Sequence, residues 1–214
     1  MLKLYGYWRS SAAYRVRIAL NHKNIPYEQQ SVHLVKKEQH SIAYQQINPN
    51  RLVPTLVDGD FQLNQSLAIL DYLESTFPEP ALLPSEPRKR AEVLALATDV
   101  ACDIHPLNNL RVLQYLSEDL TVTDQQKSDW YAHWITEGFA GFEAKLQKTA
   151  GDFCFGDTVT WADLCLIPQV YNAHRFKVDL EPFPTIRRID EACNQLPAFV
   201  DALPENQEDA VQPA

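Results

Sequence analysis

Apolar and polar positions along the first eighty residues follow two different periods. Residues 2–5 form a short apolar run that predicts a strand over 2–6, whereas apolar residues at positions 12, 16, 19 and 20 predict a helix over about 11–23. Further short patterns predict strands near 27–33, 53–57 and 61–63, a short helix at 41–47 and a helix that follows Gln65 and Ser66. This order predicts an α+β domain in which a mixed four-stranded sheet is flanked by helices.

The second half of the chain shows no convincing strand pattern. Prolines at positions 78, 80, 84 and 87 cannot continue a helix, so they indicate a linker at 81–87 between a domain at 1–80 and a domain at 88–214. Apolar residues then recur at helical spacing, and helices are predicted at about 124–148 and 161–173, followed by a shorter one at 184–195. The second domain is therefore expected to be all-helical, with a mobile polar tail after Pro204.

Two serines, Ser10 and Ser11, stand where the first predicted helix begins. Serine is a favoured N-cap because its hydroxyl accepts a hydrogen bond from an N–H group of the first helical turn. The same helix end carries partial positive charge, so it favours an anion, and a thiol bound there would ionise more readily. Gln65 and Ser66 open another helix in a similar way. Taken alone, such junctions indicate only well-capped helices, so the anion site depends on other features.

Val53 and Pro54 begin a strand that otherwise reads as internal. Proline removes a backbone donor from a sheet ladder, which indicates a special geometry such as a cis bond. A cis proline would turn the backbone N–H and C=O of Val53 outward, toward an extended peptide. Two helix N-termini and one exposed backbone edge would suit a small peptide that carries a carboxylate at one end and a thiol at the other.

Composition narrows the classes of partner. The 214 residues include 19 Lys and Arg against 28 Asp and Glu, and the formal net charge of −9 argues against nucleic acid as a partner. No apolar run is long enough to cross a membrane or to serve as a signal peptide, so a cytoplasmic protein without membrane contact is expected. The four cysteines are widely spaced and form no CxxC pair, so no metal site is expected.

Several motifs occur in one order along the chain: RSSAAYRVRIAL at 9–20, NPNRLVPTL at 48–56, NQSLAILDYLE at 64–74, HPLNNLRVL at 105–113 and RFKVDL at 175–180. Together they resemble the zeta class of cytosolic glutathione transferases, and the resemblance covers nearly the whole chain. It implies a thioredoxin-like first domain, an all-helical second domain, reduced glutathione as the cofactor and a homodimer.

The resemblance also implies roles for individual residues. Ser11, together with Ser10, would stabilise the thiolate of glutathione and would therefore be catalytic. Glutathione-binding positions of the class match the following residues: Ser10, Ser11, Gln39, Val53, Pro54, Gln65, Ser66, His105, Asn108 and Asn109. Arg9 and Arg175 are candidates to hold the carboxylates of a substrate, because a guanidinium grips a carboxylate with paired hydrogen bonds. Arg175 could equally be a surface ion-pair residue.

The zeta class contains isomerases that act on maleylacetoacetate or on maleylpyruvate. The implied reaction converts maleylacetoacetate to fumarylacetoacetate, in phenylalanine and tyrosine breakdown, by thiolate addition, bond rotation and elimination. Leu110 favours maleylacetoacetate, because maleylpyruvate isomerases tend to carry an arginine at this position, although the adjacent Arg111 could compensate. The usual cysteine after the two serines is Ala12 here, so bound glutathione must supply the sulfur nucleophile.

The sequence is also compatible with other functions. The same site would suit a maleylpyruvate isomerase, or a glutathione S-transferase that conjugates small electrophiles such as α-halo acids. A non-catalytic binding protein on the same fold is a further alternative, because a fold alone does not guarantee chemistry. Some charged residues are interpreted as structural, namely Arg15 and Arg17 on the first helix and Asp163 as the capping partner of Thr160.

Overall fold

A four-stranded sheet forms the centre of the first of two units in this computed structural model, which describes residues 1–210. The strands are β1 (Leu2–Gly6), β2 (Tyr27–Ser31), β3 (Thr55–Asp58) and β4 (Phe61–Asn64), in the spatial order β2-β1-β3-β4. β1 is parallel to β2 and antiparallel to β3, and β3 is antiparallel to β4. The predicted mixed sheet is therefore confirmed.

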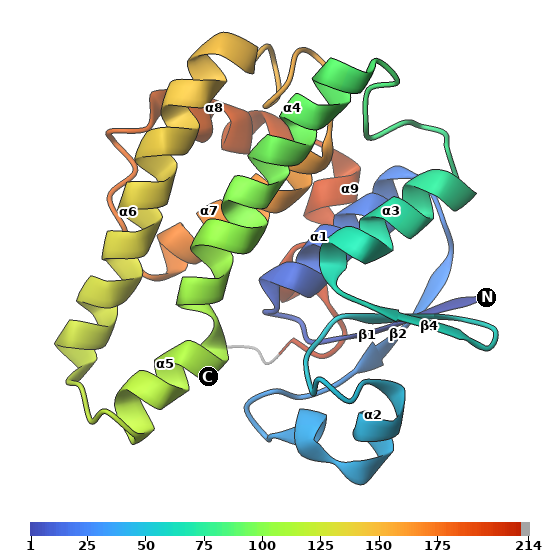
Figure 1. Cartoon of the computed structure of the whole chain (residues 1–214), viewed down its shortest axis with the longest axis vertical. Helices are drawn as coiled ribbons and strands as arrows, with labels where there is room; N and C mark the ends of the chain where they lie inside the picture. Colours follow the sequence, from blue (N-terminus) through green and yellow to red (C-terminus); the bar gives the residue numbers. More distant parts are fainter. Residues whose placement is uncertain (211–214) are drawn as a thin grey trace. The chain divides into compact units, whose positions relative to one another are not determined.

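Helices cover both faces of this sheet (Figure 1). They are α1 (Ser11–His22), α2 (Ile42–Ile47), α3 (Ser66–Thr76) and, near the C-terminus, α9 (Pro197–Val200), with short 3-10 helices at Glu38–His40 and Pro204–Asn206. α1 packs against α3 and against α9. Leu4 and Leu56 face each other across β1 and β3, and both are buried together with Val16 of α1. This core fixes the end of β1 and the start of α1.

The predicted elements differ from the structure mainly at their ends. β2 ends at Ser31 instead of residue 33, and the predicted loop at 33–40 contains a short 3-10 helix. β3 begins only at Thr55, so Val53 and Pro54 precede the strand instead of opening it. The Val53–Pro54 peptide bond is cis.

Helices alone make up the second unit, Leu82–Cys193. They are α4 (Pro87–Thr98), a π-helical turn at Asp99–Ile104, a 3-10 turn at His105–Asn108, α5 (Leu110–Glu118), α6 (Asp124–Thr149), α7 (Trp161–Arg175) and α8 (Pro184–Cys193). α7 packs against α4 and α8, and α6 packs against the π-helical turn. The all-helical prediction is confirmed.

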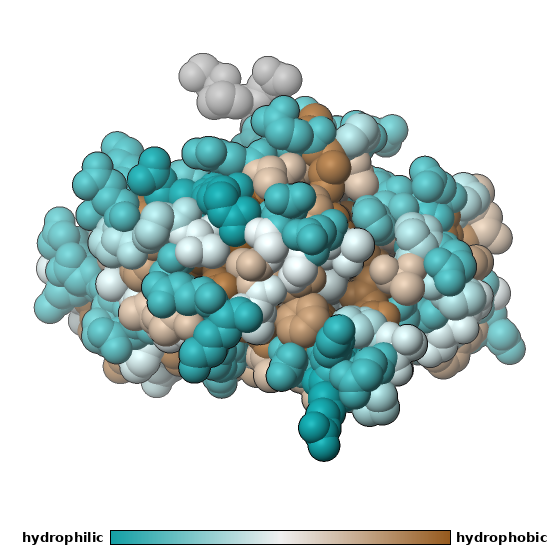
Figure 2. All heavy atoms as spheres, turned by 90° about the horizontal axis from the view of Figure 1, so that it is seen from above, coloured by the Kyte–Doolittle hydropathy of each residue, from teal (hydrophilic) through white to brown (hydrophobic). Residues whose placement is uncertain are grey.

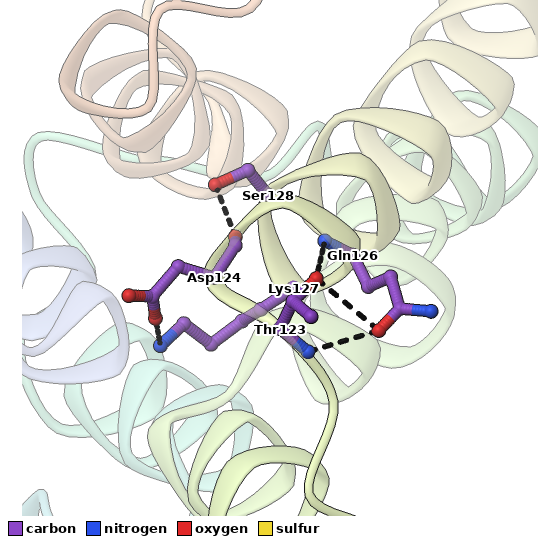
Figure 3. Close-up of polar contacts among 5 residues, drawn as sticks. All are labelled: Thr123, Asp124, Gln126, Lys127 and Ser128. Atoms are coloured by element: carbon purple, nitrogen blue, oxygen red, sulfur yellow. Dashed lines mark hydrogen bonds and ion pairs between the residues drawn. The ribbon is translucent and has the colours of Figure 1, made fainter.

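A capping box begins α6, the longest of these helices (Figure 3). The Thr123 hydroxyl accepts a hydrogen bond from the Gln126 N–H at 3.2 Å, and the Gln126 side chain accepts one from the Thr123 N–H at 2.9 Å. Lys127 adds an ion pair with Asp124 at 2.8 Å. These contacts satisfy N–H groups that the first helical turn leaves without intrahelical partners.

α7 begins with the predicted capping pair. The buried Asp163 carboxylate accepts hydrogen bonds from the Thr160 N–H and, at its other oxygen, from the Cys154 N–H, each at 2.8 Å. Asp163 is therefore a structural residue, as the sequence indicated, and it also ties the loop before α7 to the start of that helix.

The C-terminal segment packs differently from the prediction. Residues 194–210 group with the first unit, whereas the predicted helical domain comprises residues 88–214. Pro204 is buried and Asp209 accepts hydrogen bonds from the first unit, so residues 204–210 are not the mobile tail that their polar composition indicated. Positions 211–214 of the predicted tail lie outside the described residues.

Hydrophilic side chains cover much of the face drawn in Figure 2, with apolar side chains between them. In the described part of the chain, no helix combines the length and the apolar character that a membrane crossing requires.

Candidate functional site

The two serines occupy different positions at the start of α1. Ser10 is the N-cap, with extended backbone angles, and its hydroxyl accepts a hydrogen bond from the Ala13 N–H at 3.2 Å. Ser11 is the first residue of the helix and is buried. The prediction of a capped helix here is confirmed, and the helix N-terminus supplies the partial positive charge that favours an anion.

A tight turn connects β1 to these serines. The Ser10 N–H donates to the Tyr7 carbonyl at 2.9 Å, which closes the turn at 7–10. Arg9 lies in this turn, and its guanidinium carbon is 4.7 Å from the centre of the Trp8 ring. Its Nη2 atom also donates to the Tyr7 hydroxyl at 3.4 Å. Aromatic neighbours therefore hold Arg9 beside the serines, and its role toward a substrate stays a prediction.

A buried polar network holds the chain just before Val53. The Tyr44 hydroxyl and the Asn48 side-chain amide donate to the Leu52 carbonyl at 2.7 and 2.8 Å. Both side chains also contact the Thr55 hydroxyl, at 3.2 and 3.1 Å. The segment that carries the cis proline is thus fixed on both sides by side chains that the sequence interpretation did not single out.

Gln65 and Ser66 lie at the start of α3. Gln65 has a φ of 71°, a left-handed conformation that is uncommon for a residue with a side chain and that is found often at functional sites. Ser66 is buried, and its hydroxyl accepts a hydrogen bond from Nη1 of Arg15 at 3.2 Å. Arg15 belongs to α1, so it links the two helix N-termini that the sequence predicted as anion sites.

Gln39 lies in the short 3-10 helix Glu38–His40. Its side chain is buried, yet its Oε1 atom has no hydrogen-bond partner among residues 1–210. Buried amide oxygens in proteins nearly always accept a hydrogen bond, from protein, water or ligand. Gln39 is therefore available to accept an N–H group from a bound molecule.

His105, Asn108 and Asn109 belong to the second unit, where the π-helical turn passes into a 3-10 turn. Asn109 caps α5, because its side-chain oxygen accepts from the Arg111 N–H at 3.1 Å. Asn108 is 5% exposed, and neither polar atom of its side chain has a hydrogen-bond partner in the described chain. Like Gln39, Asn108 is a buried amide with unused hydrogen-bonding capacity.

Arg175 ends α7 and is exposed. Its guanidinium carbon is 4.9 Å from the centre of the Phe176 ring, and that ring stacks on Tyr131 with centroids 3.6 Å apart. Burial raises the pKa of the Tyr131 phenol, while the Arg175 charge acts in the opposite direction. Whether Arg175 holds a substrate carboxylate stays a prediction.

Three residues stabilise this region through contacts that the sequence predicts only in part. Arg15 and Arg17 are structural, as the sequence indicates. Their partners are the Ser66 hydroxyl and the Ala202 carbonyl, which lie far away in the sequence, and the nearby Trp8 carbonyl. Asn48 precedes a proline-containing loop, which is a weak signal for a buried anchor. Within residues 1–210, no cluster of three or more His, Cys, Asp or Glu side chains is arranged to hold a metal ion.

Comparisons with known proteins identify the family to which this chain belongs. Residues 4–81 match the glutathione S-transferase N-terminal domain, and residues 108–203 match the C-terminal domain. A probable maleylacetoacetate isomerase of Vibrio cholerae is 54% identical over 98% of both chains.

Two solved structures extend this likeness. The holo structure of a bacterial zeta-class maleyl pyruvate isomerase has a TM-score of 0.96 and 47% identity, over 98% of this chain and 100% of the other. A maleylacetoacetate isomerase from Methylobacterium extorquens AM1, with bound malonate and glutathione, has a TM-score of 0.94 and 44% identity, over 98% and 100%. The chain therefore belongs to the glutathione S-transferase family, within the zeta class that includes the maleylacetoacetate isomerases.

Proposed function

We propose that this protein is a glutathione-dependent cis–trans isomerase that converts maleylacetoacetate to fumarylacetoacetate. The observation that carries the proposal is the start of α1, where Ser10 caps the helix, Ser11 opens it and Ala12 replaces any thiol of the protein itself. The 54% identity to a probable maleylacetoacetate isomerase along almost the full length of both chains supports the choice of reaction.

The side chains present fit reduced glutathione. A tripeptide brings N–H groups, carbonyls and carboxylates, and the buried amides of Gln39 and Asn108 have polar atoms without partners in the described chain. Both helix N-termini, at Ser11 and Ser66, favour negatively charged groups. By resemblance, the Val53 backbone would pair with the peptide, Pro54 would set its direction, and Gln65, His105 and Asn109 would complete the contacts.

The chain's own residues would activate the thiol and hold the substrate. The Ser11 hydroxyl and the positive end of α1 stabilise an anionic sulfur, which lowers the thiol pKa. Glutathione, when bound, supplies a thiolate that adds reversibly to the cis double bond and leaves after the bond has rotated. Arg9 and Arg175 are proposed to hold the substrate carboxylates and so to keep the reacting carbon in place.

The first test is turnover with a matched pair of substrates. Purified protein is given maleylacetoacetate or maleylpyruvate, with and without reduced glutathione, and products are followed by absorbance and mass. Conversion of maleylacetoacetate at unchanged mass, only when glutathione is present, is expected. Turnover of maleylpyruvate alone would move the assignment to that substrate, and a product heavier by one glutathione would indicate a conjugating transferase.

The maleylpyruvate alternative has its own support. A zeta-class maleyl pyruvate isomerase is 47% identical and matches this fold with a TM-score of 0.96. Leu110 is the residue that favours maleylacetoacetate, and it begins α5 with 36% of its surface exposed. A Leu110→Arg variant should therefore shift the ratio of kcat/KM toward maleylpyruvate, and an unchanged ratio would remove this argument.

A cytoplasmic homodimer is proposed as the working form. None of the four cysteines, all of which lie in the described chain, forms a disulfide bond, which fits a reducing compartment. Phe61 on the edge strand β4 is 45% exposed and contacts Tyr72, so an apolar surface is present at an open sheet edge. Sedimentation of the wild type and of a Phe61→Ser variant tests the dimer, and a wild-type monomer at all concentrations would exclude it.

A further inference from the structure

The C-terminal segment forms a hydrogen bond with the turn that leads to the two serines. The Trp8 N–H donates to Oδ2 of Asp209 at 3.1 Å. On the other side of the same residue, the Trp8 carbonyl accepts from Nη2 of Arg17 at 3.0 Å. Both backbone polar groups of Trp8 are therefore fixed by side chains, and Trp8 lies two residues before Ser10.

Asp209 also anchors itself to the sheet. Its carboxylate accepts hydrogen bonds from Nε2 of Gln29 at 3.1 Å and from the Ser31 hydroxyl at 2.9 Å. Gln29 and Ser31 belong to β2, which pairs with β1 in parallel register. Asp209 therefore bridges the edge strand and the turn at 7–10, so that the position of the turn depends on the C-terminal segment.

Arg17 also connects the turn at 7–10 to the C-terminal segment. Its Nε and Nη2 atoms donate to the Ala202 carbonyl at 3.1 and 3.0 Å, while Nη2 also holds the Trp8 carbonyl. Arg17 is 1% exposed, so this bridge is shielded from water. The segment after α9 thus reaches the serine turn through a buried guanidinium on one side and a carboxylate on the other.

We propose that Asp209 is a positioning residue, which orients the turn at 7–10 so that Ser11 can stabilise a thiolate at the start of α1. This inference rests on the proposed function. A hydroxyl stabilises a developing or existing charge only when its distance and direction are maintained, and small displacements of such a group lower rates strongly. Without Asp209, the Trp8 N–H loses its acceptor, and the turn keeps the hydrogen bonds from Ser10 to Tyr7 and from Arg17 to Trp8.

The charge of Asp209 and its positioning of the turn should have opposite effects on the pKa of a bound thiol. A negative charge near the start of α1 would disfavour a second anion there, so removal of the charge alone would lower the pKa of a bound thiol. Loss of positioning would instead raise that pKa, because Ser11 would no longer be aligned. Asp209→Asn removes the charge and keeps an acceptor oxygen for the Trp8 N–H, whereas Asp209→Ala removes both.

The experiment measures the thiolate absorbance of bound glutathione as a function of pH, together with kcat and KM, in the full-length protein. At a pH below the pKa of the wild-type bound thiol, Asp209→Ala is expected to lower both the thiolate fraction and kcat about tenfold, which corresponds to a rise of about one unit in the thiol pKa. The KM for glutathione should change less than about twofold, and Asp209→Asn should retain most of the activity. Glu208→Ala is the control, because Glu208 is exposed and has the same charge.

Three outcomes would overturn the inference. The first is a thiolate titration in Asp209→Ala identical to that of the wild type, even if the variant is less stable, since that indicates a purely structural contact. The second is a lower thiol pKa in both Asp209 variants, which indicates a charge effect. The third is a wild type that binds glutathione without ionising it. Normal ionisation without isomerisation would instead contradict the proposed function and leave the Asp209 inference supported.

Discussion

The two adjacent serines at the start of α1 have different roles. The Ser10 hydroxyl is engaged as the N-cap by the Ala13 N–H, whereas Ser11 lies inside the first turn. Replacement of Ser10 by alanine should lower the free energy of unfolding by about 1 kcal/mol, as is typical for loss of a serine cap. Urea unfolding of the variant and the wild type measures this difference, and equal midpoints would contradict the capping role.

Ser11 should affect catalysis more than stability. We expect Ser11→Ala to lower kcat by about 10²-fold, because a hydroxyl that stabilises an anionic sulfur is lost, as for one donor of an oxyanion site. Steady-state kinetics with saturating glutathione measure the effect, and Ser11→Thr, which keeps a hydroxyl, is the matched control. Full activity in Ser11→Ala would show that another group stabilises the thiolate.

At the residue scale, the sequence predicts what depends on neighbours along the chain. The Ser10 cap and the Thr160–Asp163 pair follow from spacing within four residues, and both are confirmed. The left-handed backbone of Gln65 has no such signal, because glutamine rarely adopts it and the constraint comes from the surrounding fold. Asn48 is similar, since its partners Leu52, Thr55 and Asn64 meet only after the sheet has formed.

At the scale of elements, α6 packs closely on the π-helical turn through a glycine. A Cβ atom at Gly138 would overlap the buried side chain of Ile104. Gly138→Ala should therefore destabilise the protein by about 1–3 kcal/mol, despite the better helix propensity of alanine. Thermal or urea unfolding measures this change.

Gly141 in the same helix is the control for this substitution. No described atom lies within 4 Å of a Cβ built there, so Gly141→Ala should be neutral or stabilise by up to about 1 kcal/mol. Equal effects of the two substitutions would show that the close packing at Ile104 is not maintained in solution. Asn108, which we propose to contact glutathione, lies in the 3-10 turn that follows the π-helical turn, so Gly138→Ala should also weaken glutathione binding more than Gly141→Ala does.

The start of α7 should make stability depend on pH. Burial raises the pKa of the Asp163 carboxyl above its ordinary value of 3.8, although hydrogen bonds from Cys154 and Thr160 act in the opposite direction. A group whose folded-state pKa is raised contributes stability that is fully present below its unfolded-state pKa and is lost as pH rises through the folded-state value.

An Asp163→Asn variant isolates this contribution because its amide does not titrate. The free energy of unfolding of the wild type, minus that of the variant, should decrease as pH rises from about 4 toward neutrality. Urea unfolding at a series of pH values gives this difference. A difference that is constant or increases with pH would mean that the hydrogen bonds to the carboxylate outweigh its burial.

Element types were easier to predict than their junctions. Periodicity indicates α1, α3, α6 and α7, and the structure confirms these helices, although α1 and α7 are buried on almost every side. Local sequence does not specify the passage from α4 through the π-helical and 3-10 turns to α5, since its geometry depends on packing against α6.

At the scale of the whole molecule, the first unit is closed by residues from both ends of the chain. Arg17 joins α1 to the Ala202 carbonyl, so Arg17→Met would leave the Trp8 and Ala202 carbonyls without this donor. We expect a loss of about 3 kcal/mol in the free energy of unfolding, since buried unsatisfied carbonyls are costly. Arg187→Met, at an exposed arginine of α8, should change it by about 0.5 kcal/mol or less. Equal effects in urea unfolding would contradict the bridge.

These contacts between the two ends of the chain could not be predicted from composition. The residues after Pro204 are polar and indicate a mobile tail, yet Asp209 is held by Trp8, Gln29 and Ser31. Nothing near Asp209 in the sequence identifies these donors, because they belong to the first 31 residues. The family resemblance predicts the fold, but the connection between the C-terminal segment and the serine turn depends on contacts that form only in the folded chain.

The most direct measurement of the central claim is the yield of product when glutathione is limiting. Purified protein is mixed with maleylacetoacetate and about one hundredth as much reduced glutathione, and the mass and absorbance of the product are followed to completion. If glutathione acts as a cofactor that is regenerated in each cycle, all substrate should be converted at unchanged mass. Conversion that stops after one equivalent of glutathione, with a product heavier by glutathione, would contradict the isomerase and identify a conjugating transferase.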